Sequence, residues 1–310
     1  ISVIFLILFI SLFNRIGEYG TDITGQLLAS ILIYISIKLI LRDSVNKEYL
    51  LIFISLLTYL ITIKTYFLVY IFFPIVLLTY KKNKLIRFKD LLISKIFFFS
   101  FLIGILFLII NISATGCIIF PIKNLCFPNL FSWGLNLDTV SYMSTWYEIW
   151  SKAGAGPDFR IQDPLDYIKN FNWLNNWIER YFFTKVTDFL LALFVVLSIV
   201  YLTFRDKIKV SHIYKIKKLL FFYVLIFMMF ALWFLKFPSL RYGGYILVIS
   251  LIAIPFSFLF DFKNVNYKKT KKIFYILFAV AILVFFSRNV IRLNKEFTYS
   301  AVENFNSFPF

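Results

Sequence analysis

Histidine, cysteine and acidic residues are scarce in this chain. Its 310 residues include one His, two Cys and 16 Asp+Glu, against 33 Lys+Arg. A structural or catalytic metal centre needs three or four His, Cys or carboxylate ligands, and no further His or Cys stands beside the two cysteines. We therefore expect no metal site and no required cofactor, and no motif supports a divalent cation. The single histidine, His212, lies in a basic segment apart from the candidate carboxylates, which excludes a catalytic histidine beside them.

Long polar stretches are also missing. The chain is 61% hydrophobic with a mean hydropathy of +0.82, which excludes a soluble globule of this length. Long apolar runs recur between charged loops, and about 20 helical residues cross a hydrocarbon core of about 30 Å. The sequence therefore predicts an all-α fold, a polytopic bundle of transmembrane helices. The net charge of +17 does not indicate nucleic acid, because the basic residues flank apolar runs; membrane lipids are the expected partners.

About nine hydrophobic segments can be drawn in the sequence. They are Ile1–Phe13, Gln26–Leu41, Tyr49–Ile63, Tyr66–Tyr80, Lys95–Ala114, Phe189–Phe204, Leu219–Leu235, Tyr245–Phe260 and Ile273–Ser287. The third and fourth are predicted to form a tight hairpin with Lys64 at its turn. Without that hairpin, the most basic loops would fall on opposite sides of the membrane.

With the hairpin in place, charge divides the loops into two sets. One side holds 19 Lys+Arg and 5 Asp+Glu, and the other holds 13 and 11. Because basic loops stay on the cytoplasmic side, we expect a bacterial inner (cytoplasmic) membrane protein with these loops in the cytoplasm. The candidate site residues and the long loop 114–188 then lie on the outer, periplasmic face.

The long loop 114–188 is the only sizeable segment between the spans, and it is expected to be an insertion within a single membrane domain that covers residues 1–310. Asp163 precedes Pro164 as a helix start would, and Trp146, Trp150, Trp173 and Trp177 form two i, i+4 pairs. Such pairs predict short amphipathic helices at the headgroup level. Because the sequence begins with Ile1 and not with Met, and because its first apolar run is short, we expect it to be N-terminally truncated.

Three groups of residues in the outer loops are candidates for chemistry. Cys117 and Cys126 have the spacing of a disulfide that closes a small loop in an oxidising compartment; the alternative is two buried thiols. Glu18 and Asp22, four residues apart at the membrane surface, suit a general base, with Arg15 beside an anionic donor. The alternative there is that Glu18 pairs with Arg15 and Asp22 caps the next helix.

The third group lies in the turn Lys236–Gly244. Lys236 and Arg241 bracket a proline, and two glycines precede the next helix. A guanidinium group, free amides and a helix N-terminus together suit a phosphate or pyrophosphate. The alternative is that Arg241 only reaches out to lipid headgroups.

The arrangement resembles the GT-C class of membrane glycosyltransferases, which use polyprenyl-phosphate-linked sugars. The similar stretches are the acidic loop Glu18–Asp22, the hairpin around Lys64, and Arg241-Tyr242 with the later Pro255. The glutamate–aspartate loop and the cysteine-flanked loop also look like an uncharacterised bacterial membrane protein family. The sequence departs from the GT-C class in one respect. The first outer loop of that class usually has two adjacent acidic residues, and this pair is absent here. A missing N-terminal segment would carry it.

The resemblance implies inverting sugar transfer from a polyprenyl-phosphate donor in cell-envelope synthesis. Asp22 or Glu18 would act as the base, and Arg241, with Lys236 or Arg15, would hold the phosphate, with Tyr242 and Lys64 nearby. Two further hypotheses stay open at this point. One is an O-antigen or capsule polymerase or ligase, and the other is a transporter, flippase or non-catalytic assembly subunit.

Overall fold

A computed structural model describes residues 21–41, 47–79, 91–156, 159–205, 213–259 and 267–299. These ranges contain helices and two isolated β-bridges but no strand, as the all-α prediction requires. The elements are α2 (Asp22–Leu41), α3 (Lys47–Ile63), η1 (Thr65–Ile71), α4 (Phe72–Thr79), α6 (Lys95–Thr115), η2 (Lys123–Leu125), α7 (Leu137–Ser151), α8 (Pro164–Ile168), α9 (Leu174–Trp177), η3 (Ile178–Val186), α10 (Thr187–Phe204), α11 (Ile213–Lys236), η6 (Leu240–Gly244), α12 (Tyr245–Ser257) and α13 (Tyr267–Tyr299).

The protein is a multi-pass helical membrane protein. Within the described ranges, six helical stretches are long and apolar enough to cross a bilayer: Asp22–Leu41, Lys95–Thr115, Leu174–Phe204, Lys218–Lys236, Leu240–Ser257 and Lys271–Ile291. The predicted number of about nine is therefore not matched. Of the other three predicted segments, Ile1–Phe13 lies outside the described residues and α3 has 17 residues. Of Tyr66–Tyr80 the structure describes the 3₁₀ helix η1, which continues directly into α4.

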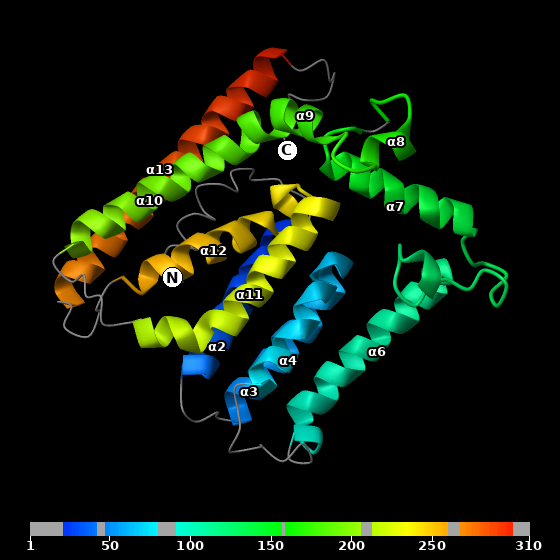
Figure 1. Ribbon diagram of the computed structural model, residues 1–310, viewed down its shortest axis with the longest axis horizontal. Coiled ribbons are helices and arrows are strands. Elements are labelled where there is room, and N and C mark those ends of the chain that lie inside the picture. The colour runs from blue at the N-terminus through cyan, green and yellow to red at the C-terminus, as the bar shows by residue number, and fades with distance from the viewer. Residues whose placement is uncertain are drawn as a thin grey trace.

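One apolar core joins α2, α3, η1, α4, α11 and α12, which pack around each other in the middle of the molecule (Figure 1). Ala29, Leu32 and Ile33 of α2 are fully buried in it. α6 packs against α3 and stands at the edge of the molecule, and Ser100 is its one buried residue. An apolar helix without a protein cover on most of its faces is the expected form of a lipid-facing span.

The chain reverses direction at Lys64, as the hairpin predicts. Lys64 has an extended backbone between α3 and η1, with φ −151° and ψ 134°. Phe67 then packs beside Gly25 near the start of α2, and Phe73 contacts Phe222 of α11 at 5.1 Å between ring centroids. The hairpin therefore returns into the bundle core and leaves Lys64 at the same end as the start of α2.

The segment between α6 and the next span is shorter than expected. The helical stretch that includes α10 begins at Leu174 rather than Phe189, because Trp177 and Tyr181 of its first turns turn inward to the core. Asp163 caps α8 as its position suggests, accepting hydrogen bonds from two backbone amides at 3.0 Å each. Trp173 and Trp177 are 1% and 5% exposed, so their indoles pack inside the protein and do not face lipid, and the headgroup level of the four tryptophans stays a prediction.

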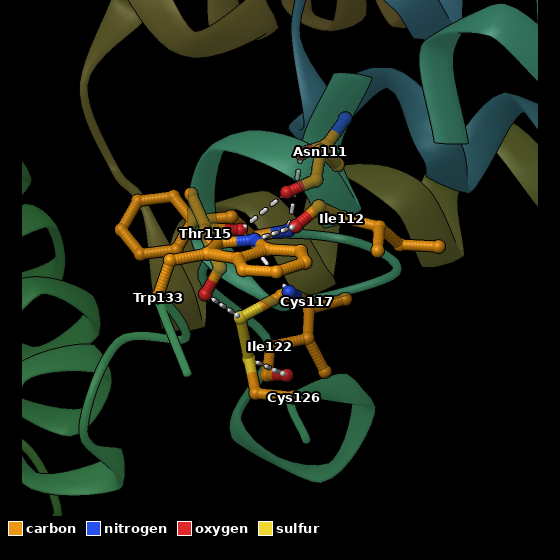
Figure 2. Close-up of a disulfide and its surroundings, with 8 residues drawn as sticks. Asn111, Ile112, Thr115, Cys117, Ile122, Cys126 and Trp133 are labelled. Carbon is orange, nitrogen blue, oxygen red and sulfur yellow. Dashed lines mark hydrogen bonds between the residues drawn. A yellow bond between two sulfur atoms is a disulfide. The ribbon is translucent and has the colours of Figure 1, made fainter. Parts of the chain in front are cut away.

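Cys117 and Cys126 form a disulfide just beyond the end of α6 (Figure 2). Around it lies a small separate apolar cluster with Val140, against which Phe120 and Leu137 pack. Backbone hydrogen bonds tie this loop to the end of α6, from Leu135 N–H to the Thr115 carbonyl and from Phe127 N–H to the Gly116 carbonyl, each at 3.0 Å.

Candidate functional site

Three charged residues from distant parts of the chain meet at one end of the bundle. The Asp22 carboxylate accepts hydrogen bonds from Nε and Nη2 of Arg241 at 2.9 and 2.7 Å, both on Oδ2. Its Oδ1 accepts from the Lys64 ammonium. The residues are separated by 42 and 219 positions in the sequence, so only the packing of α2, the hairpin and η6 brings them together.

Close packing at the start of α2 fixes the position of Asp22. A Cβ on Gly25 would lie 2.2 Å from a ring carbon of Phe67, which is itself fully buried. The missing side chain therefore allows the hairpin to reach the first turn of α2. Because Phe67 lies three residues after Lys64, this contact also sets where the ammonium reaches Asp22.

Gln26, one turn after Asp22, holds the backbone that carries Arg241. Its amide nitrogen donates to the carbonyl oxygens of Leu240 and Arg241, both at 3.2 Å. Its carbonyl oxygen accepts from the Ile246 N–H at 3.3 Å. Gln26 is completely buried, so these bonds satisfy an amide that would otherwise be costly inside the bundle.

Aromatic side chains hold the rest of the turn before α12. The Trp177 indole donates to the Pro238 carbonyl at 2.9 Å, and the Trp233 indole donates to the Ser239 carbonyl at 3.0 Å. The Tyr181 hydroxyl accepts from Leu240 N–H at 2.8 Å. Gly243 adopts φ +87°, a conformation that favours glycine. The turn is therefore rigidly supported, as a binding loop requires.

The burial of the three charges is uneven. The side chain of Asp22 is 4% exposed, whereas those of Lys64 and Arg241 are 26% and 45% exposed. Among the described residues, two cations therefore share one carboxylate at this surface. The carboxylate sits beneath the cations and orients them, so the open side of the cluster suits an anion.

A second cluster, again one carboxylate with two cations, lies at the other end of the same turn. Glu148 of α7 binds Lys152 at 2.6 Å and Lys236 at 3.3 Å, one on each carboxylate oxygen. The Phe237 and Tyr242 rings, 6.1 Å apart, connect the two clusters, and the Tyr242 ring lies 5.8 Å from both Lys64 Nζ and Arg241 Cζ. Through Glu148, the segment between α6 and α9 takes part in the site.

Lys152 is the most buried cation of the second cluster, at 1% exposure. Its ammonium lies 4.9 Å from the centre of the Trp173 ring, and the Tyr167 hydroxyl donates to its carbonyl at 2.7 Å. Burial lowers the pKa of Lys152, and the hydrogen bond and negative charge of Glu148 oppose that shift. A lysine held in this way positions Glu148 and leaves Lys236, 64% exposed, as the accessible cation.

The structure therefore unites part of the site that the sequence suggests. Asp22, Lys64 and Arg241 are in direct contact with Tyr242 beside them, and Lys236 pairs with Glu148 instead. Arg15 and Glu18 lie outside the described residues, so their predicted roles stay predictions. Among the residues the structure describes, no group of three or more His, Cys, Asp or Glu could hold a metal ion. Glu148 is one of several outer-loop carboxylates that no motif spacing distinguishes in the sequence, and its ion pairs with Lys152 and Lys236 mark it as part of the site.

A comparison with known proteins adds a family assignment. Residues 1–248 match the model of a family described as a domain of unknown function, DUF8201. The chain belongs to this family. The matched region covers α2, the hairpin, α7 and the turn with Arg241, and therefore both charged clusters. No curated protein and no solved structure matches the chain.

Proposed function

We propose that this DUF8201 protein binds the phosphate group of a lipid-linked sugar at Lys64 and Arg241 and transfers the sugar to an acceptor. The membrane concerned would be a bacterial inner membrane, with the site on its periplasmic face. The observation that carries the proposal is the convergence of Asp22, Lys64 and Arg241 at one end of a membrane bundle. The similarity of the hairpin and the Arg-Tyr pair to the GT-C class supports glycosyl transfer as the reaction.

A lipid phosphate would compete with Asp22 for the same two cations. Arg241 donates twice to one carboxylate oxygen, and a phosphate offers the same kind of acceptor with more charge. As the phosphate takes Lys64 and Arg241, the Asp22 carboxylate is released at the place where an acceptor hydroxyl arrives. Binding of the donor and activation of the base would then be one event.

The transfer is a single displacement at the anomeric carbon of the donor sugar. The acceptor oxygen forms a bond to the anomeric carbon, and the bond from that carbon to the phosphate oxygen breaks. The electron pair leaves with the lipid phosphate, whose added charge Lys64 and Arg241 stabilise. The acceptor proton passes to Asp22. Attack opposite to the leaving group inverts the anomeric centre.

The proposal is tested in cells by Asp22→Asn. The substitution should abolish the envelope saccharide that a deletion strain also lacks, while the protein remains in the membrane at normal abundance. Lys169→Ala, at a lysine 66% exposed and outside both clusters, is the matched control and should leave the saccharide unchanged. An intact saccharide profile with Asp22→Asn would remove Asp22 from the role of base. A polymerase or ligase acting on the same donors differs in the acceptor, which the released product would identify.

The 3₁₀ helix η1 (Thr65–Ile71), which begins directly after Lys64, favours a second candidate function, transport or flipping of a lipid-linked anion. Interrupted or irregular helices at the substrate site are typical of transporters. Reconstituted vesicles distinguish the two functions. A flippase moves a labelled prenyl phosphate between leaflets without changing it, whereas a transferase produces a new glycoside.

A further inference from the structure

The loop 116–137 between α6 and α7, here called the disulfide loop, has an apolar exterior. Its single charged residue is Lys123, and it contains no Asp or Glu. Four large apolar side chains are exposed within it, namely Ile122 at 40%, Phe127 at 38%, Leu130 at 73% and Trp133 at 57%. A loop surrounded by water would carry polar groups at such positions, so this surface indicates contact with a membrane or a partner.

The depth of the loop is set by the end of α6. The Trp133 indole donates a hydrogen bond to the Ile112 carbonyl at 3.3 Å, in the last turn of the helix (Figure 2). α6 is one of the six stretches that can cross a bilayer, and most of its apolar side chains are exposed. Trp133 therefore lies at the level where a membrane-spanning helix ends, which is where indole rings prefer to be.

The shape of the loop is fixed from within. The disulfide joins its two halves, and the Asn111 carboxamide oxygen of α6 accepts from the Phe120 N–H at 3.4 Å. The backbone that carries the exposed apolar side chains is therefore already ordered. The loop does not have to fold when it contacts a surface. Preorganisation of this kind lowers the cost of binding.

An open groove of about 440 Å³ lies along the end of α6 beneath the loop. Its walls are Thr62 of α3 and side chains of α6 such as Ile103 and Phe107, and Phe120 of the loop closes part of it. The lining is almost entirely apolar, and α6 borders it along the face toward α3. Its chemistry suits a hydrocarbon chain rather than a polar ligand.

We propose that the disulfide loop inserts into the lipid headgroup layer at the membrane face where α6 ends, with a lipid acyl chain in the open groove below it. Lys123 supplies a cation for lipid phosphates, and the lack of acidic residues removes repulsion from them. The bilayer is favoured as the partner because the apolar surface continues directly from that of α6. This role is independent of the function proposed for the two charged clusters.

The test uses the tryptophan fluorescence of the full chain in nanodiscs. The signal of Trp133 is the difference between the protein and its Trp133→Phe variant. We expect lipids brominated near the headgroup end of the acyl chain to quench this difference signal. Aqueous iodide should leave its intensity unchanged. Leu130→Trp in the Trp133→Phe background should behave in the same way at the exposed tip of the loop.

Two results would overturn the proposal. Quenching by iodide without quenching by brominated lipid would place the loop in water. Protection from both would mean that a second copy or another protein covers it. The circular dichroism spectrum and the alkylation-resistant disulfide of each variant establish that the loop is still folded, so that a lost signal is not mistaken for unfolding.

Discussion

At the scale of single residues, the Asp22 cluster is held together by unequal burial. The carboxylate is almost inaccessible, whereas its two cations reach the surface. Water can still solvate Lys64 and Arg241 after loss of Asp22. Water cannot solvate the Asp22 carboxylate in the same way after loss of both cations, and a buried unpaired charge is strongly destabilising.

The first prediction follows from this asymmetry. The double variant Lys64→Met/Arg241→Met should lower the free energy of unfolding by about 3–5 kcal/mol. Asp22→Asn alone should cost less, and adding it to the double variant should restore much of the loss, because the buried charge is then gone. Denaturation in detergent of the four proteins measures these differences. A triple variant no more stable than the double one would contradict the account.

The second prediction concerns Gly25. Gly25→Ala places a methyl group 2.2 Å from a carbon of the fully buried Phe67 ring. We expect a loss of about 1–3 kcal/mol in the free energy of unfolding and a weaker contact between Lys64 and Asp22. Gly104→Ala is the matched control, because its nearest neighbour, a Thr58 methyl, would be at an ordinary 3.7 Å. Equal melting temperatures for the two variants would show that the close packing of Gly25 is unimportant.

At the scale of elements, helices are predicted well where composition alone decides them. Six of the predicted segments correspond to the six long apolar stretches, and the change of charge between loops predicts the turn at Lys64. The start at Leu174 was missed because Glu179, Arg180 and Lys185 look like loop residues. There the inward-facing Trp177 and Tyr181 decide the structure, and burial against other helices is not visible in local sequence.

The third prediction concerns the disulfide loop as an element. Replacing both Cys117 and Cys126 by Ser should cost about 2–3 kcal/mol of local stability, the loop-closure value for so short a loop. Amide hydrogens of residues 116–137 should exchange faster in the variant, while those of α2 and α12 should be unchanged, because the loop has its own small apolar cluster. Faster exchange throughout the bundle would contradict this separation.

At the scale of the whole molecule, the sequence predicts which residues share a membrane face but not which of them touch. Charge counting places Asp22, Lys64 and Arg241 at one face, and their ion pairs are consistent with this. The pairing of Lys236 with Glu148 depends on how α7 docks on the end of α11, and no periodicity encodes that contact. Arg15 and Glu18 lie outside the described residues, so their share in the site stays a prediction.

The fourth prediction is the orientation of the molecule in the membrane. Lys169→Cys, in the segment between α8 and α9, should react with a membrane-impermeant maleimide in intact cells. Lys95→Cys, at the opposite end of α6, should react only after lysis. The two native cysteines are joined in the disulfide and do not interfere. The reverse labelling pattern would place both charged clusters in the cytoplasm and contradict the proposed periplasmic chemistry.

The most direct measurement of the central claim is the affinity of the purified full chain for farnesyl phosphate, a short prenyl phosphate. Loss of one charged contact should weaken binding about tenfold to a hundredfold in Arg241→Ala or Lys64→Ala, and Lys169→Ala should bind normally. Asp22→Asn should bind at least as tightly as the unaltered protein, since it removes the anion that competes for the two cations. Unchanged affinity in Arg241→Ala and Lys64→Ala would contradict the account.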